Sequence, residues 1–164
     1  MTTESGSVHR LLQATPSGEG LRIAVALARF NQSVTDRLLA GALEAFAKHG
    51  VASDAIDVAS VPGAFELPLC AQRLAATGRY DAIVCLGAVI RGETPHFEFV
   101  AGEAARGIGE VSRRFDLPLA FGLLTTDTVE QALARAGGER GNKGYEAAVT
   151  ALEMVALLRT VQKY

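Results

Sequence analysis

Short apolar segments alternate with longer amphipathic ones along most of this chain, and the alternation constrains the fold more than any other feature of the sequence. Apolar and β-branched runs predict strands at four places, 21–27, 55–61, 80–90 and 118–126. Helical periodicity predicts helices between and after them, over 33–50, 64–78, 95–115, 127–137 and 145–161. Strands that alternate with helices form parallel βαβ units, so helices should cover both faces of one sheet.

Residues at the expected helix ends support these boundaries. Ser33 can cap the first helix, and Thr94 can cap the long helix that has Pro95 at its first position, where a missing N–H costs little. Asp127 and Glu130 have the spacing of a capping box. We therefore predict an α/β fold, a three-layer α/β/α sandwich with a flavodoxin-like parallel sheet of at least four strands.

The length of 164 residues suits one domain. The polar stretch 1–20 predicts a flexible N-terminal arm or an irregular edge segment, and 21–164 a single α/β domain. No apolar run suits a signal peptide or a membrane span. A net charge of −2 with scattered Lys and Arg argues against nucleic acid and membrane as partners. Cys70 and Cys85 lie in apolar surroundings and are expected to be free thiols, which favours a cytoplasmic protein.

The last expected helix, "YEAAVTALEMVALLRTV", is apolar on nearly every side. A helix on the surface of a monomer should have a polar face. Either this helix is deeply buried or it meets another subunit. For so small a domain the pattern favours an oligomer.

Ligands of an open parallel sheet bind beyond the carboxyl ends of its strands. The loops at those ends carry a short set of polar and aromatic residues: Phe30, Asn31, Phe65, Glu66, Arg91, Glu93, Thr94 and His96. The topology should bring them to one edge of the sheet, where the start of a helix also attracts phosphate or carboxylate groups.

These residues also have structural interpretations. Phe30 can be core packing, and Glu66 can favour the dipole of its helix. Arg91 and Glu93 can form a solvated ion pair of little energetic weight. Thr94 can be a helix cap and nothing more.

Among three histidines, His96 is the best candidate for proton transfer. The positive end of a helix dipole disfavours the charged ring, so a neutral imidazole there can accept a proton and later return it. A lone histidine is more often structural, and both interpretations stay open at this point. No metal-ligand spacing, GxSxG motif or P-loop frame occurs. On fold alone, an FMN-binding flavodoxin also stays open.

Five segments, "ARFN", "VPGAFELP", "GAVIRGETPHFEFV", "FGLLTTDTVEQALARAG" and "GNKGYEAA", together resemble the lumazine synthase family over about residues 20 to 160. The resemblance implies condensation of 5-amino-6-(D-ribitylamino)uracil with 3,4-dihydroxy-2-butanone 4-phosphate. The product is 6,7-dimethyl-8-ribityllumazine, with release of phosphate and water, in riboflavin biosynthesis. It also implies a transferase without a metal or redox cofactor.

The resemblance further assigns roles to individual residues. It implies His96, Arg135 and Lys143 as the catalytic group. It also implies a set of residues in contact with substrate, through side chains or backbone: Phe30, Asn31, Ala64, Phe65, Glu66, Ala88, Val89, Ile90, Glu93, Thr94, Phe121 and Arg135. In the family, the aromatic ring of Phe30 stacks on the pyrimidine, and Glu93 and Thr94 hold the phosphate together with Arg135. Phe121 belongs to the neighbouring subunit of each pocket.

Assembly follows from the same resemblance. The family pocket spans two adjacent subunits of a homopentamer, and some members build a 60-subunit icosahedral capsid, with riboflavin synthase as a further partner. The turn "AGGERGNKG" lacks a long insertion that resists shell formation, which favours the shell, whereas its Glu139 and Arg140 differ from many shell-forming members. The alternative is a catalytically silent shell-forming or flavin-type ligand-binding protein of the same fold.

Overall fold

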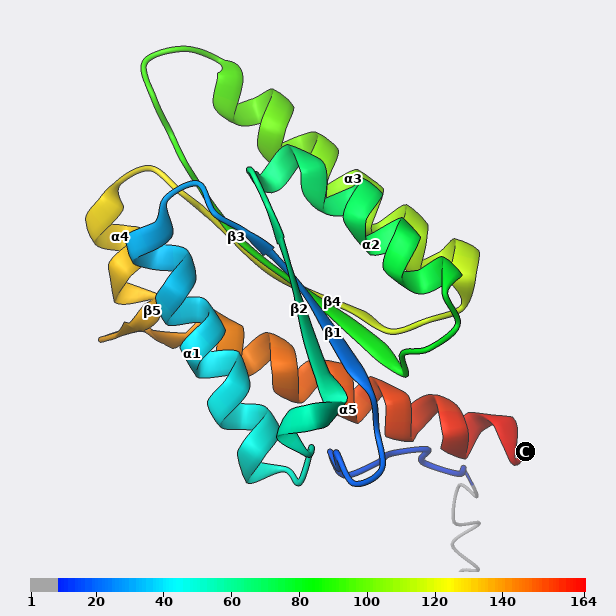
Figure 1. Cartoon of the computed structure of the whole chain (residues 1–164). Coiled ribbons are helices and arrows are strands. Elements are labelled where there is room, and N and C mark those ends of the chain that lie inside the picture. Colours follow the sequence, from blue (N-terminus) through cyan, green and yellow to red (C-terminus); the bar gives the residue numbers. More distant parts are fainter. Residues whose placement is uncertain (1–8) are drawn as a thin grey trace, which may run out of the picture.

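A parallel sheet forms the middle layer of the molecule, which we describe from a computed structural model over residues 9–164. Among these residues the sheet has four strands, β1 (Ile23–Ala28), β2 (Ile56–Val61), β3 (Ala82–Ile90) and β4 (Leu119–Thr126). Their order is β2-β1-β3-β4, and every neighbouring pair is parallel. The parallel, flavodoxin-like sheet predicted from the sequence is therefore confirmed (Figure 1).

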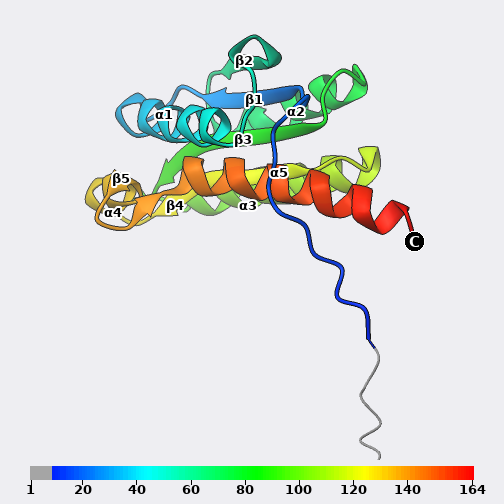
Figure 2. The same ribbon diagram turned by 90° about the horizontal axis from the view of Figure 1, so that it is seen from below.

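Helices cover both faces of this sheet, as the alternating pattern predicts. On one face lie α1 (Gln32–Lys48) and α5 (Lys143–Gln162), and on the other α2 (Leu67–Ala76) and α3 (His96–Phe115). Figure 2 views the molecule from the side of α1 and α5, with α3 behind the strands. The short helix α4 (Val129–Ala134) follows β4 and leads into a two-stranded hairpin.

Several short elements were not predicted. The hairpin consists of β5 (Ala136–Gly138) and β6 (Gly141–Asn142), and it ends α4 sooner than the expected boundary at residue 137. Single turns of 3₁₀ helix, η1 (Ser53–Ala55) and η2 (Ala64–Glu66), precede β2 and α2. Gly137 within β5 and Gly141 at the start of β6 have positive φ angles, which suit the tight turn between the two strands.

Two hydrophobic cores lie on opposite faces of the sheet because successive strand residues point to opposite sides. On β3, the side chains of Val84 and Leu86 belong to the core beneath α1 and α5. Ile83 and Cys85 belong to the core beneath α2 and α3. All four are fully buried, as expected for a strand covered on both faces.

Glycines and leucines are exchanged across the β3–β4 pair. Leu86 is the partner of Gly122, and Gly87 is the partner of Leu123. A Cβ atom on Gly122 would lie 2.5 Å from a methyl carbon of Leu86, and one on Gly87 would lie 2.8 Å from a methyl carbon of Leu123. Each glycine thus leaves room for the leucine opposite, and the register of the two strands depends on this complementarity.

A second close contact joins α1 to α5. The side-chain amide of Asn142 donates to the carbonyl of Arg37 at 3.0 Å, and its oxygen accepts from the N–H of Tyr145 at 3.1 Å. Asn142 therefore caps α5 while holding α1. A Cβ atom on Gly144 would lie only 2.0 Å from the carbonyl oxygen of Leu38, so the two helix backbones nearly touch at this glycine.

The expected helix caps were wrong by one or two residues. The N-cap of α1 is Asn31 rather than Ser33, because Asn31 adopts a left-handed conformation (φ 64°) and the helix begins directly after it. Pro95 is the N-cap of α3 instead of its first residue, so Thr94 is not the cap.

The capping box of α4 was also misplaced. It joins Thr128 to Gln131, whereas Asp127 and Glu130 were expected. Asp127 is not available as a cap because its carboxylate pairs with Arg91. The side chain of the next residue, Thr128, accepts the hydrogen bond from the N–H of Gln131 instead.

The last helix is buried along one face only. Small and apolar residues of α5 meet the sheet, among them Ala148, Ala151 and Leu152, while Met154 and Val161 are exposed. Within residues 9–164, no helix is long and apolar enough to cross a membrane.

The N-terminal arm expected over 1–20 falls partly outside the described residues, which begin at residue 9. Residues 9–18 form neither helix nor strand. In Figure 2 this part of the chain crosses α5 and then extends away from the domain. The guanidinium of Arg10 lies 4.4 Å from the ring centre of Tyr164.

The close approach of α1 and α5 predicts a large effect of one methyl group. Gly144→Ala should lower the free energy of unfolding by about 1–3 kcal/mol, because the added carbon overlaps backbone atoms that cannot move away freely. Gly102 of α3 is the control, since it is helical and exposed with nothing within 4 Å of an added Cβ. Gly102→Ala should be neutral or stabilising by up to about 1 kcal/mol. Urea unfolding at one fixed chain concentration measures both, and equal effects would contradict the contact.

Candidate active site

The carboxyl ends of β1, β2 and β3 surround an apolar pocket of about 580 Å³. Its lining residues come from the loops after those strands and from the start of α3: Phe30, Pro62, Gly63, Ala64, Phe65, Glu66, His96, Phe99 and Val100. A smaller cavity of about 240 Å³ shares Phe30, Ala64, His96 and Val100 with it and reaches the backbone of Ala88, Val89 and Ile90. Of the residues predicted to gather at this edge of the sheet, Arg91 and Glu93 line neither cavity and the other six do. We name this pair of cavities the aromatic half-site.

Asn31 shapes the floor of the aromatic half-site. Its side-chain amide donates to the carbonyl of Ala88 at 2.9 Å, which ties the loop after β1 to the end of β3. The left-handed conformation at Asn31 turns the chain immediately into α1. Phe30, one residue earlier, is left with 72% of its surface exposed, so it is not core packing. An exposed ring above an apolar pocket is suited to stacking on a planar ligand.

The opposite side of the pocket comes from η2. Phe65 is 59% exposed. The carboxylate of Glu66 has no hydrogen-bond partner among residues 9–164. It can therefore accept hydrogen bonds from a ligand without first breaking bonds inside the protein.

His96 is the first residue of α3 and borders both cavities of the aromatic half-site. Its backbone N–H lies 3.5 Å from the hydroxyl oxygen of Thr94, which lines the smaller cavity. Glu93 lies in the same loop but lines neither cavity. The positions of His96 and Thr94 thus put an imidazole ring and a hydroxyl group on the same wall.

Three further predicted residues lie elsewhere in the subunit. Phe121, Arg135 and Lys143 line a separate cavity of about 510 Å³ beside β4, together with Arg140 and Glu146. We name it the cationic half-site. The guanidinium of Arg135 donates to the carbonyl of Gln131 at 3.0 Å, and the N–H of Lys143 donates to the carbonyl of Arg135 at 2.8 Å. The two half-sites have no lining residue in common.

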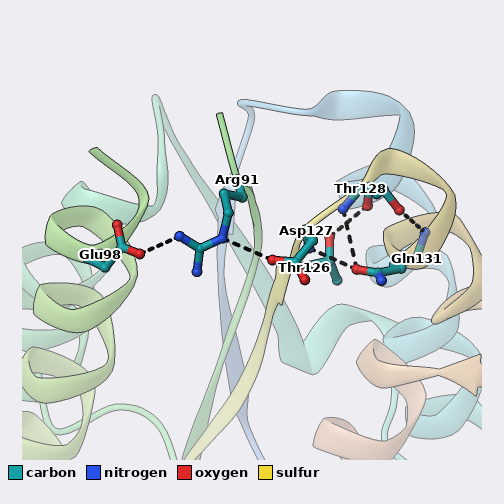
Figure 3. Close-up of polar contacts among 6 residues, drawn as sticks. All are labelled: Arg91, Glu98, Thr126, Asp127, Thr128 and Gln131. Carbon is teal, nitrogen blue, oxygen red and sulfur yellow. Dashed lines mark hydrogen bonds and ion pairs between the residues drawn. The ribbon is translucent and has the colours of Figure 1, made fainter. Parts of the chain in front are cut away.

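Arg91 makes contacts that the sequence did not suggest. It pairs with Glu98 and with Asp127, not with Glu93 (Figure 3). Its guanidinium also lies 4.3 Å from the ring centre of Phe97. Hydrogen bonding to the guanidinium lowers the pKa of Glu98, and the two carboxylates raise the pKa of Arg91. Glu98 is therefore ionised at neutral pH.

Other lining residues were missed from the sequence. Phe99 and Val100 complete the aromatic half-site, and Arg140 and Glu146 complete the cationic one. Phe99 lies three positions after His96, so helical periodicity alone places both on one face of α3. Arg140 lies in the hairpin, which the sequence analysis did not predict.

The two cysteines lie away from both half-sites and are free. Burial in the core raises the pKa of Cys85 to about 12, and partial burial raises the pKa of Cys70. No group of three or more His, Cys, Asp or Glu side chains suited to a metal ion occurs within residues 9–164. The charged and ionisable side chains that line the half-sites are Glu66 and His96 in the aromatic one and Arg135, Arg140, Lys143 and Glu146 in the cationic one.

Together, the fold and the two half-sites define a flavodoxin-like α/β protein with a ligand site at the carboxyl edge of its sheet and a cation-rich surface beside it. The family model of 6,7-dimethyl-8-ribityllumazine synthase matches residues 20–159 of the chain. A 6,7-dimethyl-8-ribityllumazine synthase from Desulfatibacillum aliphaticivorans is 54% identical over 148 residues, which cover 90% of this chain and 96% of that protein. The chain belongs to the 6,7-dimethyl-8-ribityllumazine synthase family, and the resemblance seen in its motifs is confirmed.

The cysteine environments predict a difference in reactivity toward thiol reagents. Because thiolate is the reactive form, Cys85 should not react with an aromatic disulfide reagent at pH 8, and Cys70 should react more slowly than a free thiol. In denaturant both thiols should react at once. Following the released chromophore with and without denaturant measures this, and a Cys70→Ala variant assigns the signal. Rapid labelling of two thiols in the native protein would contradict the buried position of Cys85.

Proposed function

We propose that the chain condenses 5-amino-6-(D-ribitylamino)uracil with 3,4-dihydroxy-2-butanone 4-phosphate, giving 6,7-dimethyl-8-ribityllumazine, phosphate and water in riboflavin biosynthesis. Membership of the family supports the reaction. The observation that ties it to this chain is the wall shared by Phe30 and His96, a stacking surface next to a proton-transferring group. A transferase of this kind has to bring a flat heterocycle and a reactive carbonyl compound together.

The aromatic half-site suits the uracil substrate. The exposed ring of Phe30 can stack on the pyrimidine, and backbone groups of Ala88, Val89 and Ile90 border the smaller cavity, where they can bind the polar edge of the ring. Asn31 holds the carbonyl of Ala88 in place, so this edge is fixed before the ligand arrives. The ribityl hydroxyls would donate to Glu66, with Ala64 and Phe65 beside them.

The four-carbon phosphate requires cations and N–H donors. The planar guanidinium of Arg135 can donate two parallel hydrogen bonds to a phosphate group. Lys143 adds positive charge to the same cavity, while Thr94 offers a hydroxyl group beside the positive end of the α3 dipole. Glu93 is assigned to the phosphate loop by family pattern alone. Thr94 and Arg135 belong to different half-sites, so one subunit does not present them together.

We therefore infer that each active site is completed by a neighbouring subunit, in a homopentamer. The aromatic half-site of one chain would meet the cationic half-site of the next, with Phe121 closing the pocket. Large apolar side chains left exposed near both half-sites support such contacts, namely Phe65 (59%), Leu69 (64%), Phe99 (72%) and Phe121 (38%). Surfaces of this kind are typical of subunit interfaces.

Larger assembly and location extend this proposal. Only Glu139 and Arg140 separate β5 from β6, and this short turn supports association of pentamers into a 60-subunit capsid. Riboflavin synthase, which uses the lumazine, is the proposed protein partner. The free thiols of Cys70 and Cys85 support a reducing compartment, the cytoplasm.

The chemistry moves protons at every stage. The 5-amino group attacks the butanone carbonyl and forms an imine with loss of water, phosphate leaves by elimination, and the ribityl-bearing nitrogen closes the ring with loss of a second water. His96 can accept and return these protons in turn. No strong nucleophile is needed, so holding the two substrates in reactive geometry supplies much of the acceleration.

The first test is lumazine formation from the two substrates, followed by absorbance and fluorescence against the spontaneous reaction. The protein should accelerate it, and His96→Ala should lower kcat about 100-fold, the lower range for loss of an acid–base group. Substrate binding should change much less. His49→Ala is the control, since that ring bonds to the carbonyl of Ala45 at the far end of α1. A folded oligomer without any activity would favour the silent shell or flavin-binding alternative.

Complementation tests the shared site. His96→Ala and Arg135→Ala subunits should each be weakly active alone. Unfolded together in equal amounts and refolded, they should recover activity, because about one interface in four, one half times one half, then has both halves intact. Mixing without refolding is the control. No recovery from mixed oligomers of normal size would contradict a site built from two chains.

A further inference from the structure

Arg91 joins three segments that are far apart in the sequence. It follows directly after β3, and its N–H donates to the carbonyl of Thr126 at the end of β4 at 2.8 Å. Its guanidinium bonds to Glu98 in the first turn of α3 and, through Nε, to Asp127 at 3.0 Å (Figure 3). The same group lies against the ring of Phe97. Arg91 therefore connects the start of α3 with the turn between β4 and α4.

The α3 end of this connection leads to the aromatic half-site. Glu98 and Phe97 follow His96 directly, and all three belong to the first turn of the helix. The loop that carries Thr94 leads directly into this turn. A contact that fixes Glu98 and Phe97 thus restrains the direction in which the His96 ring enters the pocket.

The β4 end of the connection leads to the cationic half-site. The N–H groups of Asp127 and Thr128 donate to the side-chain oxygen of Gln131 at 2.8 and 3.3 Å. The carbonyl of Gln131 in turn accepts from the guanidinium of Arg135 at 3.0 Å. An unbroken series of polar contacts therefore runs from Arg91 through Asp127 and Gln131 to Arg135.

We propose that Arg91 is a positioning residue that, through Glu98 and Asp127, holds in place the His96 and Arg135 half-sites of one subunit, each of which faces a different active site of the oligomer. The proposal rests on the function proposed above. Only a planar fork can reach two carboxylates on different segments while also packing on an aromatic ring, so lysine cannot replace it. Exposed ion pairs contribute little to stability. We therefore attribute the importance of these pairs to the positions in which they hold Glu98 and Asp127.

Arg106 provides a matched control within the same helix. Like Arg91, it is exposed and bonds to two carboxylates, Glu103 and Glu110, at 2.6 and 3.0 Å. All three residues lie on α3, so these pairs join no other segment. Removal of Arg106 changes surface charge by the same amount as removal of Arg91. Arg106 borders an open pocket with Phe65 and Phe99, but it lines neither half-site and its ion pairs stay within α3.

The experiment measures kcat and both KM values for the assembled wild-type enzyme and for Arg91→Ala, Arg91→Lys, Asp127→Asn and Arg106→Ala. Arg91→Ala should lower kcat about 10- to 100-fold, as expected for misplaced groups. The KM for the uracil should change less than about 2-fold, because Phe30 and Asn31 lie on the loop after β1. Arg91→Lys should recover little of the loss, and Arg106→Ala should retain wild-type kinetics.

A double-mutant cycle makes the inference specific. Asp127→Asn, which keeps the size of the side chain, should show part of the loss in kcat. Added to Arg91→Ala it should cost less than about 2-fold more, because both substitutions break the same contact. Circular dichroism and light scattering confirm that each variant is folded and assembled. If Arg91→Ala does not fold, the kcat values of the single variants Asp127→Asn and Arg91→Lys are compared with that of the wild type instead.

Several results would overturn the proposal. Wild-type kcat in Arg91→Ala or full recovery in Arg91→Lys would exclude a role for the fork. A higher KM for the butanone phosphate in Arg91→Ala, with normal kinetics in Asp127→Asn, would mean that Arg91 binds phosphate directly. Additive losses in the double variant would separate the two residues. An inactive wild-type enzyme would instead contradict the proposed function itself.

Discussion

Packing of β3 against β4 through exchanged glycines and leucines is the constraint on which both halves of the candidate site depend. The register that places Leu86 opposite Gly122 and Gly87 opposite Leu123 also sets how far each strand extends past the other at the carboxyl edge. β3 ends in the loop to His96, and β4 carries Phe121 and leads to Arg135. A shift by one residue would reverse the faces of every side chain on the strand and separate these groups from their cavities.

A small set of chemical groups is enough for this site because the fold supplies their placement. In the aromatic half-site, the hydrogen bond from the side chain of Asn31 to the carbonyl of Ala88 restricts movement of the loop after β1 relative to β3. In the cationic half-site, the N–H of Lys143 donates to the carbonyl of Arg135, whose guanidinium donates to the carbonyl of Gln131. Such preorganisation removes motion that would otherwise have to be restricted during the reaction.

The sequence predicted the four strands, their parallel order and the aromatic edge well, because these depend on local periodicity and on a general property of parallel sheets. It was less successful where residues compete for the same role. Asp127 looked like a cap until its contact with Arg91 was known, and that contact spans 36 residues, beyond the reach of any local pattern. The close approach of Gly144 to Leu38 was also hidden, since a glycine in a turn motif gives no sign of what lies opposite it.

The two ends of the described chain lie close together at the amino end of the sheet, away from the two half-sites. Arg10 lies against Tyr164 beside the last turn of α5, whereas the half-sites lie beyond the carboxyl ends of the strands (Figure 1). A peptide or a whole domain fused after Tyr164 would therefore begin far from the substrates and would not have to pass over the aromatic half-site. A fused peptide or domain and the two half-sites would then occupy opposite ends of the same sheet.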